Sequence, residues 1–75
     1  DPERAREAAE EGIRVRTVLA SLRAHDAQVI ALRAEGFSYE ELAELLALKA
    51  ASVGTRLRRA HEAFRKEYVK RYGDA

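Results

Sequence analysis

Seventy-five residues with a formal net charge of +1 suffice for one small domain, which we expect to span residues 1–75. Such a chain buries only about 60% of the surface that it exposes when unfolded, so its stability margin should be thin. The absence of cysteine excludes disulfides and thiolate-bound metal, and no apolar run approaches the roughly 20 residues of a membrane-spanning helix. Alanine, leucine, glutamate and arginine dominate the composition and predict an all-α fold.

The first half of the chain predicts two helices. Residues 3–22 carry apolar side chains at helical spacing, and a short break is expected at 21–24. Asp26 is placed to cap or open a second helix over about 26–35. Gly36 ends that helix, because glycine readily takes the left-handed conformation that follows a helix. The expected apolar stripes are Ile13, Val15, Val18, Leu19 and Leu22, then Val29, Ile30 and Leu32.

The third predicted helix has the clearest start signal. Ser38 and Glu41 form a capping box, in which each side chain accepts a hydrogen bond from the backbone N–H of the other residue. Phe37 stands where a hydrophobic staple would join it to Leu42. The helix is expected to end near Ala47 and to be followed by a turn at 48–50. Its buried side is expected to contain Leu42, Ala43, Leu45 and Leu46, with Leu48 pointing inward from the turn.

The fourth predicted helix begins near residues 51–52 and runs to about Tyr72. Residues 49–75 hold eight basic and three acidic side chains, whereas 35–48 hold four acidic side chains and no basic one. Positive charge concentrated in one segment favours a polyanionic partner. The apolar positions recur every three or four residues and are Val53, Leu57, Ala60, Phe64, Tyr68 and Tyr72.

A capped acidic helix, a short turn and a helix with one apolar and one arginine-rich side are typical of a helix-turn-helix, here over about 38–60. A rotation of about 100° per residue from Val53 turns Thr55, Arg58 and Arg59 away from the core. Arginine can donate two hydrogen bonds to guanine or to phosphate, whereas lysine and hydroxyl groups near the turn suit phosphates. The candidate DNA-binding residues are therefore Lys49, Ser52, Thr55, Arg56, Arg58 and Arg59.

This pattern resembles region 4 of bacterial sigma factors, specifically the extracytoplasmic-function group, and the resemblance covers roughly residues 13–68. It rests on Gly36, on Ser38-Tyr39-Glu40-Glu41-Leu42-Ala43, on Leu46-Ala47-Leu48 and on Ala51-Ser52-Val53-Gly54-Thr55-Arg56-Leu57-Arg58-Arg59-Ala60. The fold that the resemblance implies is a small DNA-binding bundle of three to four helices with a C-terminal helix-turn-helix.

The resemblance implies a cytoplasmic module of transcription initiation that binds the −35 element of promoter DNA. It also implies docking on the flap of the RNA polymerase β subunit and masking by an anti-sigma protein. By position, Thr55, Arg58 and Arg59 match DNA-contacting residues of the family, and Tyr39 and Glu40 match the start of the helix that lies against the DNA backbone.

Three residues depart from the family pattern. Ala47 replaces the usual glycine of the turn, so the turn must be strained or differ slightly. Arg23 replaces a proline that often follows the first helix. Gly54 replaces a residue that is often basic, which removes one contact and lowers helix propensity by about 1 kcal/mol relative to alanine.

No residue pattern predicts catalysis, so we expect a binding module without metal or cofactor. His25 and His61 are far apart and have no cysteine beside them, and the chain has neither a glycine-rich phosphate loop nor a nucleophile elbow. We expect His25 at an exposed helix start and His61 on the flank of the core. The three glutamates of the third helix, Glu40, Glu41 and Glu44, are expected to form a solvated face.

Two alternatives remain open from the sequence. One is a free-standing helix-turn-helix regulator that dimerises through Tyr68, Val69 and Tyr72, whereas a sigma domain should be monomeric. The other is a sigma-like module that binds only proteins. Because the chain begins with Asp1 instead of methionine, we also expect it to be a fragment or a processed chain.

Overall fold

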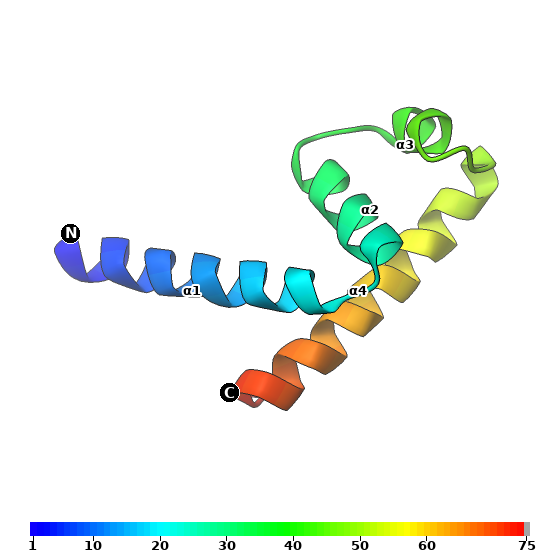
Figure 1. The fold of residues 1–75 in the computed structure, drawn as a ribbon. Helices are drawn as coiled ribbons and strands as arrows, with labels where there is room; N and C mark the ends of the chain where they lie inside the picture. Colours follow the sequence, from blue (N-terminus) through cyan, green and yellow to red (C-terminus); the bar gives the residue numbers. More distant parts are fainter. Residues whose placement is uncertain (75) are drawn as a thin grey trace.

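Four helices joined by short turns form the part of the chain that the computed structural model describes, residues 1–74. They are α1 (Pro2–Ser21), α2 (Ala24–Ala34), α3 (Tyr39–Leu45) and α4 (Ala50–Tyr72), and the all-α prediction is confirmed. Each of the other three helices contacts α4, which runs through the molecule as its central element (Figure 1). No helix within residues 1–74 has the length and apolar character needed to cross a bilayer.

At most of the helix ends, the predicted boundary differs from the observed one by one or two residues. Two of these differences have a physical cause. The second helix begins at Ala24, before the predicted start, and Asp26 lies inside its first turn with its N–H bonded to the Arg23 carbonyl at 3.1 Å. Asp26 is therefore not the cap. The third helix ends at Leu45 and not near Ala47, because the following two residues form its terminating turn.

The core joins the last three helices. It consists of Val29 from α2, Leu42 and Ala43 from α3, and Val53, Leu57 and Ala60 from α4. Burying these apolar side chains is the main force that holds α3 against α4. Ala43 is 8% exposed, as expected for a small residue where two helices cross closely. Leu48 is half-buried, in line with its predicted inward direction.

Three residues that the periodicity placed on the apolar stripes are exposed, and Tyr72 near the end of α4 is the least exposed of them, at 37%. Leu45 is 57% exposed because the inward side of the short helix α3 is already formed by Leu42, Ala43 and Leu46. Ile13 is 56% exposed because it precedes the buried Val18 by five residues, which at about 100° per residue turns it to the opposite side of α1.

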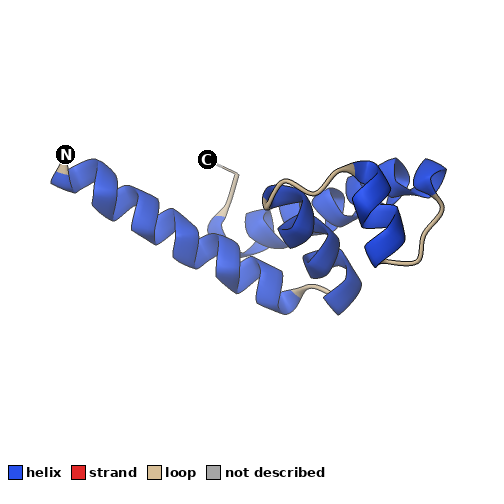
Figure 2. Cartoon of the chain, turned by 90° about the horizontal axis from the view of Figure 1, so that it is seen from above, coloured by secondary structure: helices blue, strands red, loops and turns tan. Residues whose placement is uncertain are grey.

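The second half of α1 packs on the C-terminal half of α4, while its first half extends beyond the rest of the molecule (Figure 1; Figure 2). Val18 is fully buried, and the Tyr68 hydroxyl donates to the Glu11 carboxylate at 2.9 Å. The Arg14 guanidinium carbon lies 5.2 Å from the centre of the Tyr72 ring. The two tyrosines considered for dimerisation thus contact α1 of the same chain, and α1 leaves the N-terminal half of α4 uncovered.

The helices α2 and α3 end in the same hydrogen-bonded turn, a Schellman motif. After α2, the N–H groups of Gly36 and Phe37 donate to the carbonyls of Arg33 and Leu32. After α3, the N–H groups of Ala47 and Leu48 donate to the carbonyls of Glu44 and Ala43, at 3.5 and 2.8 Å. The turn requires a left-handed residue at its centre, which is Gly36 with φ 102° in one case and Ala47 with φ 55° in the other.

Ala47→Gly should therefore raise the free energy of unfolding by about 1 kcal/mol, because a Cβ disfavours the left-handed conformation. Gly36→Ala should lower it by a similar amount: a Cβ at Gly36 would meet no atom within 4 Å, so its cost is conformational and not steric. Urea unfolding of both variants measures the two changes. If both substitutions change the free energy of unfolding in the same direction, the left-handed conformation does not explain the two changes.

At Arg23, the backbone has the conformation that the family's proline would impose. Its φ is −59° and its ψ is 145°, and Leu22 before it is extended with φ −81° and ψ 164°. Both lie in the regions that a proline and its preceding residue adopt. The arginine therefore keeps the turn between α1 and α2 in a proline-compatible shape.

The predicted capping box at the start of α3 is confirmed. Glu41 N–H donates to the Ser38 hydroxyl oxygen at 3.1 Å, and Ser38 N–H donates to the Glu41 carboxylate at 2.8 Å. The backbone N–H of Ser38 lowers the pKa of Glu41 below its ordinary value of 4.5, because the hydrogen bond favours the charged form. The box fixes where α3 begins and so where Tyr39 stands.

Because the folded pKa of Glu41 is lowered, its contribution to stability is present above the ordinary value and is lost as the pH falls through the folded value. The stability difference between the wild type and Glu41→Gln should therefore be constant near neutral pH and shrink below about pH 4. Urea midpoints of both proteins between about pH 7 and pH 3 measure it. If the stability difference between the two proteins does not change with pH, the hydrogen bond from Ser38 does not favour the charged form of Glu41.

Candidate nucleic-acid interface

The helix-turn-helix consists of α3, the turn at residues 46–49 and the first half of α4. Leu42 and Ala43 hold α3 against α4 through Val53 and Leu57, all within one buried cluster. The Ser38–Glu41 box fixes the start of α3, and the left-handed turn after Leu46 fixes the direction in which α4 leaves. These contacts leave one side of the first turns of α4 open to solvent.

The structure places the candidate residues on this open side. Thr55, Arg58 and Arg59 are exposed, while the core residues Val53, Leu57 and Ala60 are buried. The direction that helical geometry predicted for the three exposed side chains is therefore confirmed. Lys49 is the residue before the first turn of α4, Ser52 is exposed in that turn, and Arg56 is half-buried on the flank.

Arg58 is held along the helix by an ion pair. Its Nη1 lies 3.0 Å from the Glu62 carboxylate one turn later, and both side chains are more than half exposed. An exposed pair of this kind contributes only about 0.2–1 kcal/mol. A phosphate or a guanine base can therefore replace Glu62 as the partner of Arg58 at little cost.

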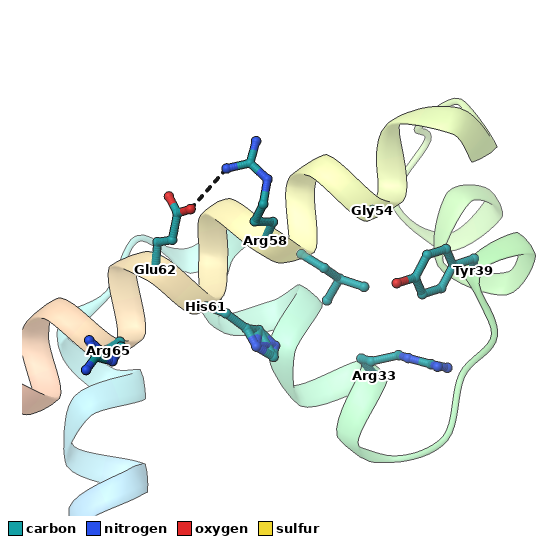
Figure 3. A pocket seen from close by; sticks show the side chains of 8 residues that line it. Arg33, Tyr39, Gly54, Arg58, His61, Glu62 and Arg65 are labelled. Atoms are coloured by element: carbon teal, nitrogen blue, oxygen red, sulfur yellow. Dashed lines mark hydrogen bonds and ion pairs between the residues drawn. The ribbon is translucent and has the colours of Figure 1, made fainter.

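A groove beside this exposed face was not predicted from the sequence. It has a volume of about 490 Å³ and lies between α4 and the adjoining parts of α2 and α3 (Figure 3). Figure 3 shows Arg58 and Glu62 along one rim, with His61 projecting from α4 on the side of α2. Its lining residues are Arg33, Tyr39, Gly54, Leu57, Arg58, His61, Glu62 and Arg65.

Arg33 is fixed at the wall of the groove by two contacts. Its Nη1 donates to the Phe37 carbonyl at 2.7 Å, and its guanidinium carbon lies 5.2 Å from the centre of the Tyr39 ring. A cation stacked on an aromatic ring in this way is held in place while its other donors stay free for a ligand. Sequence reasoning missed Arg33, since it stands on a different helix from the other candidates.

Gly54, which stands where the family often has a basic residue, is part of the lining of the groove. A Cβ at this position would meet one atom within 4 Å, Cε2 of Tyr39 at 3.8 Å, which is an ordinary contact. Gly54 thus adds no side chain to the lining that it shares with Tyr39 and Leu57. His61, expected on the flank of the core, is exposed at the edge of this space, and His25 is exposed at the start of α2 as predicted.

The charge of this surface suits an anion. Arg33, Arg58 and Arg65 line the groove with a single carboxylate, that of Glu62, while Arg59 and Thr55 extend the polar surface along α4. Guanidinium groups match both phosphate oxygens and the major-groove edge of guanine. Within residues 1–74 the structure contains no group of three side chains arranged to hold a metal ion.

Residues 12–63 match the model of the family described as Sigma-70, region 4. No curated protein and no solved structure matches the chain. The matched segment covers more than half of the chain and contains α2, α3, the turn between α3 and α4, and the exposed arginine face. The chain therefore belongs to the sigma-70 region 4 family, the helix-turn-helix DNA-binding part of sigma factors.

Proposed function

We propose that this domain recognises the −35 element of promoters for a sigma factor of the extracytoplasmic-function group. The observation that carries the proposal is the exposed face of Thr55, Arg58 and Arg59 on the second helix of the motif, in a chain of the region 4 family. The subgroup is supported by the Ser38–Glu41 box and the residues that follow it, which match the pattern of that group.

In the proposed complex, the first half of α4 enters the major groove. Arg58 and Arg59 are exposed and can donate paired hydrogen bonds to guanine, which discriminates against a wrong base by about 1–3 kcal/mol. Lys49 and Ser52 stand at the start of α4, where phosphate contacts set the register. Arg33 and Tyr39 line the groove together with Arg58 and add contacts to the DNA backbone.

The proposal extends to the other partners expected for the domain. Family membership supports docking on RNA polymerase, and we propose the β-subunit flap as the contact and an anti-sigma protein as a regulator. The activity is binding and positioning in the cytoplasm, without catalysis or a cofactor. Co-migration of the chain with a purified bacterial β-flap fragment in gel filtration tests the polymerase contact.

Selection from a pool of randomised DNA duplexes tests the main proposal. The chain should enrich one non-palindromic motif and bind it as a monomer. Its affinity should fall steeply with added salt, because lysine and arginine displace counterions from phosphates. A palindromic motif bound by a dimer would favour the free-standing regulator. No binding at low salt would favour the module that binds only proteins.

A further inference from the structure

The guanidinium groups that line the groove differ in whether a carboxylate neutralises them. Nη1 of Arg58 lies 3.0 Å from Oε1 of Glu62. Nη2 of Arg65 lies 3.7 Å from Oδ2 of Asp74. Arg33, which is exposed on α2, forms no ion pair within the described part of the chain. It is therefore the arginine of the groove whose charge is left for an anion from outside.

Two contacts hold Arg33 in place without neutralising it. Its Nη1 donates to the Phe37 carbonyl at 2.7 Å, and its Cζ lies 5.2 Å from the centre of the Tyr39 ring. The other N–H donors of the guanidinium group remain for a ligand. A side chain that is already ordered loses less conformational entropy when it binds. Arg33 is thus charged, ordered and only partly hydrogen-bonded, which suits a phosphate.

The Tyr39 ring connects Arg33 to α4. The guanidinium group lies over the ring, and a Cβ at Gly54 would lie 3.8 Å from its Cε2 atom. Figure 3 shows the ring between the segment of α4 that contains Gly54 and the side chain of Arg33. Because Gly54 has no side chain, the cation beside this ring comes from α2 and not from α4.

We infer that Arg33 holds one phosphate of a DNA strand that passes over Gly54, and that Tyr39 is the residue that positions it. The inference rests on the proposed DNA binding and adds a specific contact from α2, outside the helix-turn-helix. A cation introduced at position 54 would lie against the same tyrosine and reach the same phosphate. The two positions can therefore replace each other.

A double-mutant cycle between positions 33 and 54 tests the shared phosphate. Fluorescence anisotropy measures binding to the duplex that carries the selected motif and to an unrelated duplex, between about 50 and 200 mM salt. Arg33→Ala should weaken binding to both about fivefold at about 0.15 M salt and reduce the salt slope by about 0.9. Gly54→Lys should restore most of this loss in the Arg33→Ala protein and add less in the wild type, because one phosphate releases its counterion once.

A control with matched charge separates the site from general attraction. Arg33→Ala/Ala8→Lys has the same net charge as Arg33→Ala/Gly54→Lys. Ala8 is exposed on the part of α1 that extends away from α3 and the start of α4, so this protein should still bind weakly (Figure 1). Arg33 is exposed and a Cβ at Gly54 makes an ordinary contact, so the variants should fold, which circular dichroism checks.

Two substitutions at Tyr39 test its positioning role. Tyr39→Leu removes the ring and should reduce the salt slope as Arg33→Ala does, with no further reduction when the two are combined. Tyr39→Phe keeps the ring and should keep the slope. Neither substitution changes the charge of the protein, so a smaller slope reports a displaced guanidinium group. An unchanged slope in Tyr39→Leu would show that Tyr39 does not position Arg33.

The outcomes distinguish the inference from the proposed function. If Arg33→Ala binds both duplexes as the wild type does, or loses its preference at one base pair only, Arg33 holds no phosphate and the inference is overturned while DNA binding stands. If Gly54→Lys tightens binding equally with and without Arg33, the two positions serve different phosphates and the shared site is wrong. If the wild type binds neither duplex at low salt, the proposed function fails and the inference fails with it.

Discussion

Leu42→Ala should lower the free energy of unfolding by about 2–5 kcal/mol, the usual range for emptying a buried leucine site. Leu42 is fully buried and is the largest core side chain of α3. The helix has only seven residues, so it depends on packing against α4 and not on its own propensity. Since the margin of so small a domain is thin, the variant should be largely unfolded at 37 °C and should lose DNA binding.

Leu45→Ala is the matched control, because it removes the same atoms from the same helix. Leu45 is 57% exposed, so the change should stay within about 0.5 kcal/mol and leave DNA binding intact. Urea unfolding followed by circular dichroism measures both variants. Similar losses for the two would mean that Leu45 packs inward and that the core described above is wrong.

The sequence predicted correctly those features that depend on the geometry of a single helix. Ser38 and Glu41 form their box with each other, and the spacing of Val53, Leu57 and Ala60 fixes the inward side of α4 without reference to other elements. The same spacing turns Arg59 outward, so the exposed face of α4 followed from local geometry. Whether that face contacts DNA is a separate question, which remains a proposal.

The failures concern residues whose surroundings depend on the packing of several helices. Leu45 is apolar and lies at helical spacing, but α3 packs into the core through Leu42 and Ala43 and leaves Leu45 exposed. The groove was missed because Arg33, Tyr39 and His61 come from three helices, and no spacing within one helix relates them. The φ of 55° at Ala47 could be anticipated only from the family pattern, because alanine itself does not signal a left-handed turn.

Arg59→Ala should weaken binding to the selected duplex by about 1–3 kcal/mol, or roughly 5- to 150-fold, if Arg59 donates two hydrogen bonds to a guanine. Arg59 is exposed and alanine is a better helix former, so the fold should be unaffected. The variant should also lose its preference at one base pair. Duplexes that differ at each single position of the selected motif locate that base pair.

Arg4→Ala removes the same charge from a distant place. Arg4 is exposed in the first turn of α1, on the part of the helix that extends away from α3 and from the start of α4 (Figure 1). Charges separated by more than the screening length of about 8 Å at physiological salt interact weakly, so this variant should bind almost as the wild type does. The comparison separates a contact at Arg59 from a general loss of positive charge.

The pattern of loss at Arg59 identifies the kind of contact. A base contact predicts weaker binding to the selected motif together with relaxed discrimination at one position. A phosphate contact predicts equal weakening on every duplex and a salt dependence that is smaller by about one unit of slope. The second result would move Arg59 to the group of Lys49 and Ser52 and leave Arg58 and Thr55 as the base-reading candidates. If Arg59→Ala binds as Arg4→Ala does, the DNA lies on another face of α4.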